Sequence, residues 1–115
     1  INALVRRLSD ESAEVRNHAI DALGEFASEL STDQVAPSTR DGSTETRVKA
    51  AELLGEIGDR TAIAVLHPLL GDPSPDVRVA VIEALTALKA VMTEREVSAL
   101  LADPDPDVRR AALEY

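Results

Sequence analysis

The sequence has no cysteine and very few aromatic residues, and both absences limit what the chain can do. Without cysteine there is no disulfide bond, no thiolate nucleophile and no thiolate metal ligand. Aromatic residues make up 2% of the 115 residues, with one Phe, one Tyr and no Trp, whereas hydrophobic residues make up 44%. Leu, Val, Ile and Ala must therefore form the core, which favours helices that pack closely through small side chains.

Positive charge is also scarce, because 12 Lys and Arg stand against 21 Asp and Glu, which gives a net charge of -9. Such a chain repels nucleic-acid phosphates and anionic lipids. No apolar run approaches the roughly 18 residues of a membrane helix, and the first residues, INALVRR, lack the apolar stretch of a signal peptide. We therefore expect a soluble, cytoplasmic protein that binds neither nucleic acid nor membrane.

What the sequence does contain is a repeat with a period of 31 residues. The segments DESAEVR, DGSTETR, DPSPDVR and DPDPDVR begin at that spacing, at Asp10, Asp41, Asp72 and Asp103. Apolar residues recur with the same period at Ile20, Ala51, Ile82 and Leu113, and at Leu23, Leu54 and Leu85. A period of about 20 to 50 residues is typical of solenoids, in which each unit stacks on its neighbours.

Each repeated segment carries the signals that begin a helix. Side-chain oxygens that can cap a helix N-terminus stand at Ser12, Ser43, Ser74 and Asp105. Pro75 and Pro106 follow at the first helical position, where a missing N–H costs nothing. Acidic residues then lie beside the positive end of the helix dipole, at Glu14, Glu45, Asp76 and Asp107. Apolar residues at helical spacing predict a second helix in each unit, near residues 13 to 28, 44 to 57, 75 to 90, and from 106 onward.

The first helix of each unit is expected to be shorter. Ser31 with Gln34, and Thr93 with Glu96, fit the capping-box pattern that begins such a helix. In the second unit Thr39 replaces the leucine of the other units, so this first helix should be weak. The sequence thus predicts an all-α domain of about three and a half two-helix units, approximately 1–29, 30–59, 60–91 and 92–115. Because no Met begins the chain and the fourth unit stops within its second helix, we expect part of a longer solenoid.

This pattern resembles the HEAT repeat, especially the short HEAT-like repeats of many prokaryotic proteins and of phycobilisome (bilin) lyases. The resemblance spans the chain and is carried best by LHPLLGDPSPDVRVAVIEAL, from Leu66 to Leu85, and by AAELLGEIGDRTAIAVL, from Ala50 to Leu66. It implies an α-α superhelix in which turn aspartates and second-helix arginines form an internal ladder between repeats. Those residues are Asp10, Arg16, Asp41, Arg47, Asp72, Arg78, Asp103 and Arg109. An ionic binding patch is the alternative, but a partner site seldom needs the same pair in every repeat.

Signals for catalysis are absent or weak. The two histidines, His18 and His67, have only ordinary surface carboxylates or amides one turn away. HEAT-like deoxyhypusine hydroxylases use His-Glu pairs as metal ligands, whereas Ala19 and Pro68 follow the histidines here. There is no nucleophile elbow, P-loop or dinucleotide fingerprint. The basic, aromatic face of HEAT-like alkylpurine DNA glycosylases does not fit this composition either. We expect a protein that is not an enzyme, with no catalytic residue, cofactor or metal.

A row of acidic residues is the best candidate for a binding surface. Four occupy equivalent positions on the second helices and two lie one turn further along: Asp21, Glu52, Glu83 and Glu114, then Glu25 and Glu56. Like charges at this spacing disfavour a helix by about 0.2 to 0.5 kcal/mol per pair. In HEAT arrays the second helices line the concave surface, so the resemblance places this row in a groove. The row either binds a basic segment of a partner or only keeps the face solvated.

By elimination, the sequence favours a scaffold or adaptor that presents the second-helix face to a protein partner. The alternative, by analogy with the family alone, is an accessory subunit of a bilin-lyase-like or other enzyme-associated complex. A third interpretation, a structural spacer within a larger protein, predicts no specific ligand.

Overall fold

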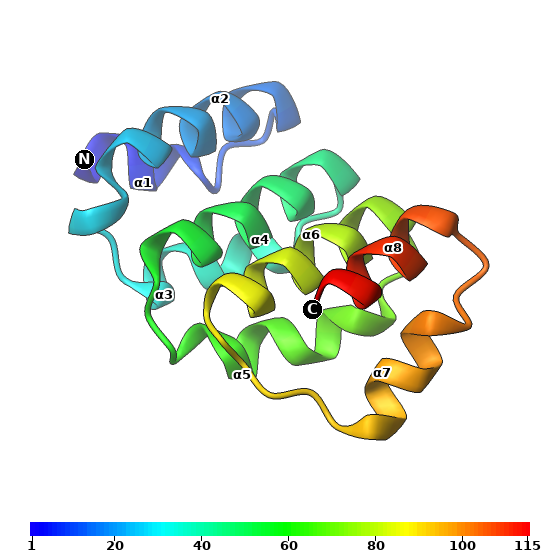
Figure 1. The fold of residues 1–115 in the computed structure, drawn as a ribbon. Helices are drawn as coiled ribbons and strands as arrows, with labels where there is room; N and C mark the ends of the chain where they lie inside the picture. Colours follow the sequence, from blue (N-terminus) through cyan, green and yellow to red (C-terminus); the bar gives the residue numbers. More distant parts are fainter.

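The computed structural model describes residues 1–115, and all of its regular elements are helices. The first members of the helix pairs, called A helices here, are α1 (Asn2–Arg7), α3 (Thr32–Val35), α5 (Ala62–Leu66) and α7 (Glu94–Leu101). The second members, the B helices, are α2 (Ala13–Leu23), α4 (Thr44–Ile57), α6 (Pro75–Ala87) and α8 (Pro106–Glu114). Figure 1 shows the B helices side by side, with the A helices below them. This arrangement confirms the expected all-α superhelix.

The B helices begin where the capping residues predict. Ser12 and Ser43 each accept a backbone hydrogen bond at 3.4 Å, and Asp105 accepts two, at 2.8 and 3.3 Å. Ser74 holds the N-cap position of α6, but its side chain accepts no such bond. The starts are predictable because they depend on contacts within a few residues.

Two of the B helices end earlier than expected. The helix predicted over residues 13 to 28 stops at Leu23 and continues as a 3-10 segment, η1 (Gly24–Glu29), in which Phe26 has non-helical torsion angles. The helix predicted to residue 90 stops at Ala87, and Lys89 adopts the left-handed conformation, with φ of 56°. The helix α4 ends as expected, with Gly58 in that conformation.

The A helices are short in more than one unit. After α3 the chain forms the 3-10 segment η2 (Ala36–Arg40), and after α5 it forms η3 (His67–Gly71). Thr39, the residue expected to weaken the second unit, is buried and donates its hydroxyl to the Ala36 carbonyl at 2.6 Å. A brief α-helix that tightens into a 3-10 turn is therefore shared by the second and third units.

The core lies between the A and B helices. The recurring leucines Leu23, Leu54 and Leu85 are fully buried. At the other recurring apolar position, Ile20, Ala51 and Ile82 are buried, whereas Leu113 on α8 is 75% exposed. The helices α4 and α6 approach closely at Gly55, where an added Cβ would lie 3.2 Å from the Ala84 Cα. None of the helices combines the length and apolar character required to cross a membrane.

Candidate functional site

Three ion pairs connect the turns of successive units. Each joins an arginine to an aspartate 25 residues later, at 2.7, 3.1 and 2.9 Å: Arg16–Asp41, Arg47–Asp72 and Arg78–Asp103. The arginine Nη1 also donates to the carbonyl of the aspartate in its own unit, as from Arg47 to Asp41 at 2.8 Å. Each of these arginines therefore contacts the turns of two units.

The environment of two of these aspartates, Asp41 and Asp103, favours their charged form. Burial alone would raise the pKa of Asp41, but hydrogen bonds from Arg16 and Ser43 and the charges of Arg16 and Arg47 lower it overall. The pKa of Asp103 is also lowered, because the Asp105 N–H and the Arg78 side chain outweigh its burial. The paired side chains are at most 17% exposed, so little of their charge can reach a partner.

The two remaining residues of the expected ladder, Asp10 and Arg109, form hydrogen bonds only within their own units. The Asp10 carboxylate accepts a hydrogen bond from the Ser12 N–H at 2.9 Å, and Arg109 donates to the Asp103 carbonyl at 2.6 Å.

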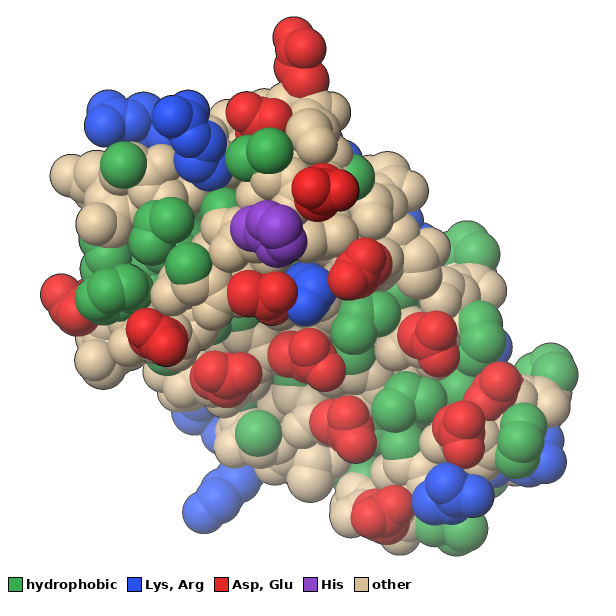
Figure 2. Space-filling model, turned by 90° about the horizontal axis from the view of Figure 1, so that it is seen from above, with side chains coloured by type: hydrophobic (Ala, Val, Ile, Leu, Met, Phe, Trp, Pro, Cys, Tyr) green, Lys and Arg blue, Asp and Glu red, His purple; other side chains and the backbone are tan.

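The surface formed by the four B helices, called the helix-B face here, is the main candidate for a binding site. Figure 2 looks onto this face and shows acidic side chains spread over its middle, with most basic side chains near its margins. Its largest hollow has a volume of about 740 Å³ and crosses α4, α6 and α8. The lining residues are Thr44, Glu45, Val48, Glu52, Asp76, Val79, Ala80, Glu83, Asp107, Arg110, Ala111 and Glu114.

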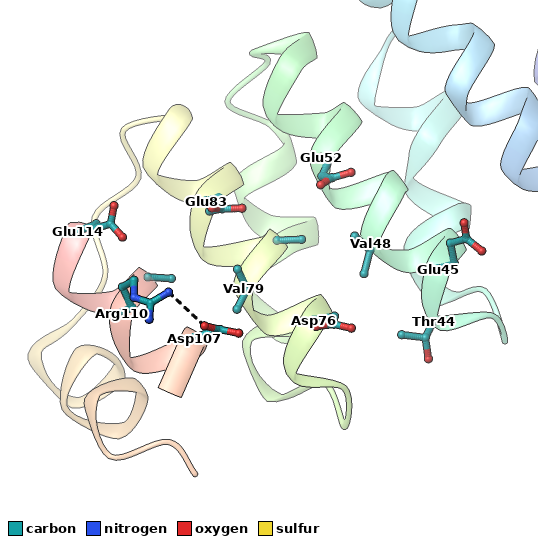
Figure 3. A pocket seen from close by; sticks show the side chains of 12 residues that line it. Thr44, Glu45, Val48, Glu52, Asp76, Val79, Glu83, Asp107, Arg110 and Glu114 are labelled. Atoms are coloured by element: carbon teal, nitrogen blue, oxygen red, sulfur yellow. Dashed lines mark hydrogen bonds and ion pairs between the residues drawn. The ribbon is translucent and has the colours of Figure 1, made fainter. Parts of the chain in front are cut away.

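The hollow contains three parallel rows (Figure 3). Glu52, Glu83 and Glu114, from the row predicted by the sequence, form one edge, called the second acidic row here. The opposite edge, the first acidic row, consists of Glu45, Asp76 and Asp107. Apolar side chains, including Val48 and Val79, lie between them. Six carboxylates and a single guanidinium thus line the hollow. The guanidinium is that of Arg110 on α8, which pairs with Asp107 at 3.2 Å.

The first acidic row was assigned from the sequence only to helix starts. A signal for its surface role was nevertheless present, because Glu45 and Glu52 are seven residues apart. Seven residues are about two helical turns, so both side chains lie on one face of α4. The same spacing relates Asp76 to Glu83 on α6.

The remaining residues of the predicted row lie elsewhere. Asp21 pairs with Lys49 Nζ at 2.7 Å and, with Glu56, lines a small hollow of about 70 Å³ between α2 and α4. Glu25 lies in η1 and lines neither this hollow nor the larger one, because α2 ends two residues earlier. The structure therefore gathers the second acidic row and separates Glu25 from it.

The acidic side chains at the centre of the helix-B face repel one another. Partial burial raises the pKa of Glu52, and Glu83, Glu56 and Asp21 raise it further, against the opposing effect of Lys49. The pKa of Lys49 is raised chiefly by its hydrogen bond to Asp21. The hollow therefore has a negative potential that a cationic group would relieve.

The histidines do not join the acidic residues in a metal site. His18 is exposed on α2. His67 Nδ1 lies 3.0 Å from Glu96 Oε2, and Glu96 also caps α7 through Thr93. The structure has no group of three or more histidine and acidic side chains arranged to hold a metal ion.

The comparisons with known proteins agree with this architecture. The sequence matches the family described as HEAT repeats over residues 32–115 and that described as HEAT repeat over residues 1–30. No curated protein matches it. Among solved structures, it is similar to a chain in the complex of CpcE and CpcF of phycocyanin lyase from Nostoc sp. PCC7120, with a TM-score of 0.72 and 20% sequence identity. The match covers 96% of this chain and 61% of that one, and at this identity it shows the fold alone.

Proposed function

The chain belongs to the HEAT-repeat family, and from that premise we propose that it is an interaction scaffold whose helix-B face binds a partner protein. Stacked helical repeats present extended surfaces that suit contact with other proteins. The observation that carries the proposal is the hollow across α4, α6 and α8, where six carboxylates surround apolar side chains. Such a surface favours a protein segment with basic and apolar residues over a phosphate backbone or an anionic lipid.

The contact residues we propose are centred on the second acidic row, Glu52, Glu83 and Glu114, with Asp21 and Glu56 beside it. Glu25 is the outlying member of the sequence-based set. We propose that the arginine–aspartate pairs stabilise the stack and do not bind the partner, because each charge is already paired with the opposite charge of a neighbouring unit. They would keep neighbouring B helices in register and so preserve the spacing of the acidic rows. The proposal assigns no catalytic step to the chain itself.

Affinity capture from the source organism tests this function. The bait would be the wild-type chain or the double variant Glu52→Lys/Glu83→Lys. The matched control, Glu11→Lys/Glu29→Lys, makes the same charge change at two exposed residues outside both hollows. A partner retained by the wild type and the control but lost by the double variant is the expected result. A partner captured equally by all three baits would argue against the helix-B face.

A second candidate is an accessory subunit of an enzyme complex. It is favoured by the structural match over 96% of the chain to a chain from a complex of two lyase proteins. Mixing the chain with a bilin and a phycobiliprotein would test the bilin-lyase form of this proposal. A coloured covalent adduct that depends on the chain would support it, and no dependence on the chain would count against it.

A further inference from the structure

The size of the side chains explains why the hollow lies over α4, α6 and α8. Ala80 and Ala111 line it at the repeat position that His18 and Lys49 occupy in the first two units. The two alanines leave space in the third and fourth units, whereas the longer His18 and Lys49 side chains fill the equivalent space in the first two units. The floor of the hollow, which is the apolar surface between the two acidic rows, is therefore open beside Val79 and narrows toward α2.

The floor is also limited at both ends of its apolar row. The position of Val48 and Val79 is taken in the first unit by Asn17, which is buried and accepts a hydrogen bond from Thr46 Oγ1 at 2.5 Å. In the fourth unit the same position is Arg110, which pairs with Asp107. The apolar contact offered to a partner is thus centred on α4 and α6 and continues toward α8 through Ala111.

We propose that this hollow binds an amphipathic α-helix of the partner, with an apolar stripe flanked on both sides by Lys or Arg. The inference rests on the proposed function and specifies the partner's chemistry. The seven-residue separation of the two acidic rows corresponds to about 10.5 Å along a B helix. A helix with its side chains is about 10 to 12 Å across, so it fits between the rows.

A helix also matches the order of the rows better than an extended peptide does. The hollow presents acidic, apolar and acidic side chains in turn (Figure 3). A helix can turn an apolar stripe to the floor while basic residues on its two flanks reach both edges. An extended strand sends alternate side chains in only two opposite directions. It can satisfy the acidic rows or the floor, but not all three rows together.

The spacing of the B helices sets the register of the bound helix. Packed helices lie about 8 to 10 Å apart, and seven residues of a partner helix advance about 10.5 Å. Apolar residues seven positions apart on the partner helix would therefore contact successive B helices. Apolar residues three or four positions after them would lie over Ala80 and Ala111. A partner segment of about 14 residues would span the three helices.

Three synthetic peptides of about 18 residues, built from Leu, Lys, Ala and Gln with one Pro in the third, test this inference. The first has a leucine stripe flanked by lysines, and the second has the same residues in an order without a stripe. The third replaces one central Ala of the first with Pro, which breaks a helix. Fluorescence anisotropy at low salt would measure binding to the wild-type chain, to Val79→Gln and to Glu52→Lys/Glu83→Lys.

We expect the first peptide to bind roughly tenfold more tightly than the other two, because only it buries leucines on the floor. Val79→Gln should reduce that preference while leaving the weaker binding of the other peptides unchanged. Adding the first peptide to the wild-type chain should change the amide chemical shifts around Val48, Val79 and Ala111. This measurement does not depend on whether a variant folds.

Equal binding of all three peptides, weakened in each case by Glu52→Lys/Glu83→Lys, would overturn the helix inference and leave the proposed function standing. Peptide binding that this double variant does not change would contradict both. Chemical-shift changes confined to residues outside the hollow would also overturn the inference.

Discussion

Arg78 and Asp103 form a bidentate pair between successive units. The Arg78 Nε donates to Asp103 Oδ2 at 2.9 Å, and its Nη2 donates to Oδ1 at 3.0 Å. The Nη1 of the same guanidinium donates to the Asp72 carbonyl at 2.7 Å. One side chain thus fixes the turn before α6 relative to the turn before α8. Since α6 and α8 are two of the three helices that line the hollow, this pair also affects the geometry of the helix-B face.

The first prediction is that Arg47→Ala and Arg78→Ala destabilise the chain more than Arg95→Ala. Each of the first two changes removes charge-assisted hydrogen bonds and leaves a mostly buried aspartate without its arginine. The expected loss is on the order of 1 to 3 kcal/mol. Arg95 is exposed and forms no ion pair, so its replacement is the control. Urea unfolding at pH 7 would measure the difference, and identical midpoints for the three variants would exclude a stabilising ladder.

The second prediction concerns acid. The pKa values of Asp41 and Asp103 are lowered from the ordinary value of 3.8, so the folded state binds protons at these groups less readily than the unfolded state. Their contribution to stability is therefore present above about pH 3.8 and is lost as the pH falls through the lowered values. Unfolding midpoints measured between pH 6 and pH 2 should drop in this window. Asp103→Asn should be less stable at pH 6 and should show a shallower drop. A drop as steep as that of the wild type would assign the acid sensitivity to other groups.

How far the fold could be predicted depends on the range of the interactions involved. The starts of α2, α4, α6 and α8 follow from capping residues and a 31-residue period, and both can be recognised in the sequence. The helix ends were less predictable, because apolar residues continue beyond Leu23 and Ala87 while Phe26 and Lys89 depart from helical angles. Apolar spacing alone does not report such departures.

The candidate site was predictable only in part, for a related reason. Sequence spacing aligned Glu52, Glu83 and Glu114, since equal positions in stacked helices lie in a row. The depth of the hollow depends on the small size of Ala80 and Ala111 next to side chains from neighbouring helices. This depth depends on how the helices pack together, so it cannot be predicted from the sequence of any one helix.

The third prediction follows from the left-handed conformation of Lys89, with φ of 56°. Its repeat equivalent is Gly58, which has φ of 76° at the end of α4. Glycine adopts this conformation without the steric cost that a Cβ imposes. Lys89→Gly should therefore stabilise the chain by about 0.5 to 1 kcal/mol, and Gly58→Ala should destabilise it by a similar amount. Thermal melting of both variants would check this, and destabilisation by Lys89→Gly would show that its side chain contributes more than its backbone costs.

The last prediction links the charge of the hollow to binding. The pKa of Glu52 is raised above its ordinary value of 4.5 by partial burial and by Glu83, Glu56 and Asp21. A bound lysine-rich peptide would add positive charge near Glu52, favour its ionised form and lower that pKa. By linkage, such a peptide binds the ionised hollow more tightly, so its affinity should rise as the pH increases from 4.5 and then level off.

This dependence should be measured with the leucine-striped peptide between pH 4.5 and pH 7 at constant low salt. Glu52→Gln removes the titrating group with little change in shape, so its affinity should be lower at pH 7 and should vary less with pH. The ladder aspartates with lowered pKa values, Asp41 and Asp103, remain ionised in this range, which keeps their ion pairs intact. If the variant and the wild type show the same pH profile, Glu52 does not face the bound peptide.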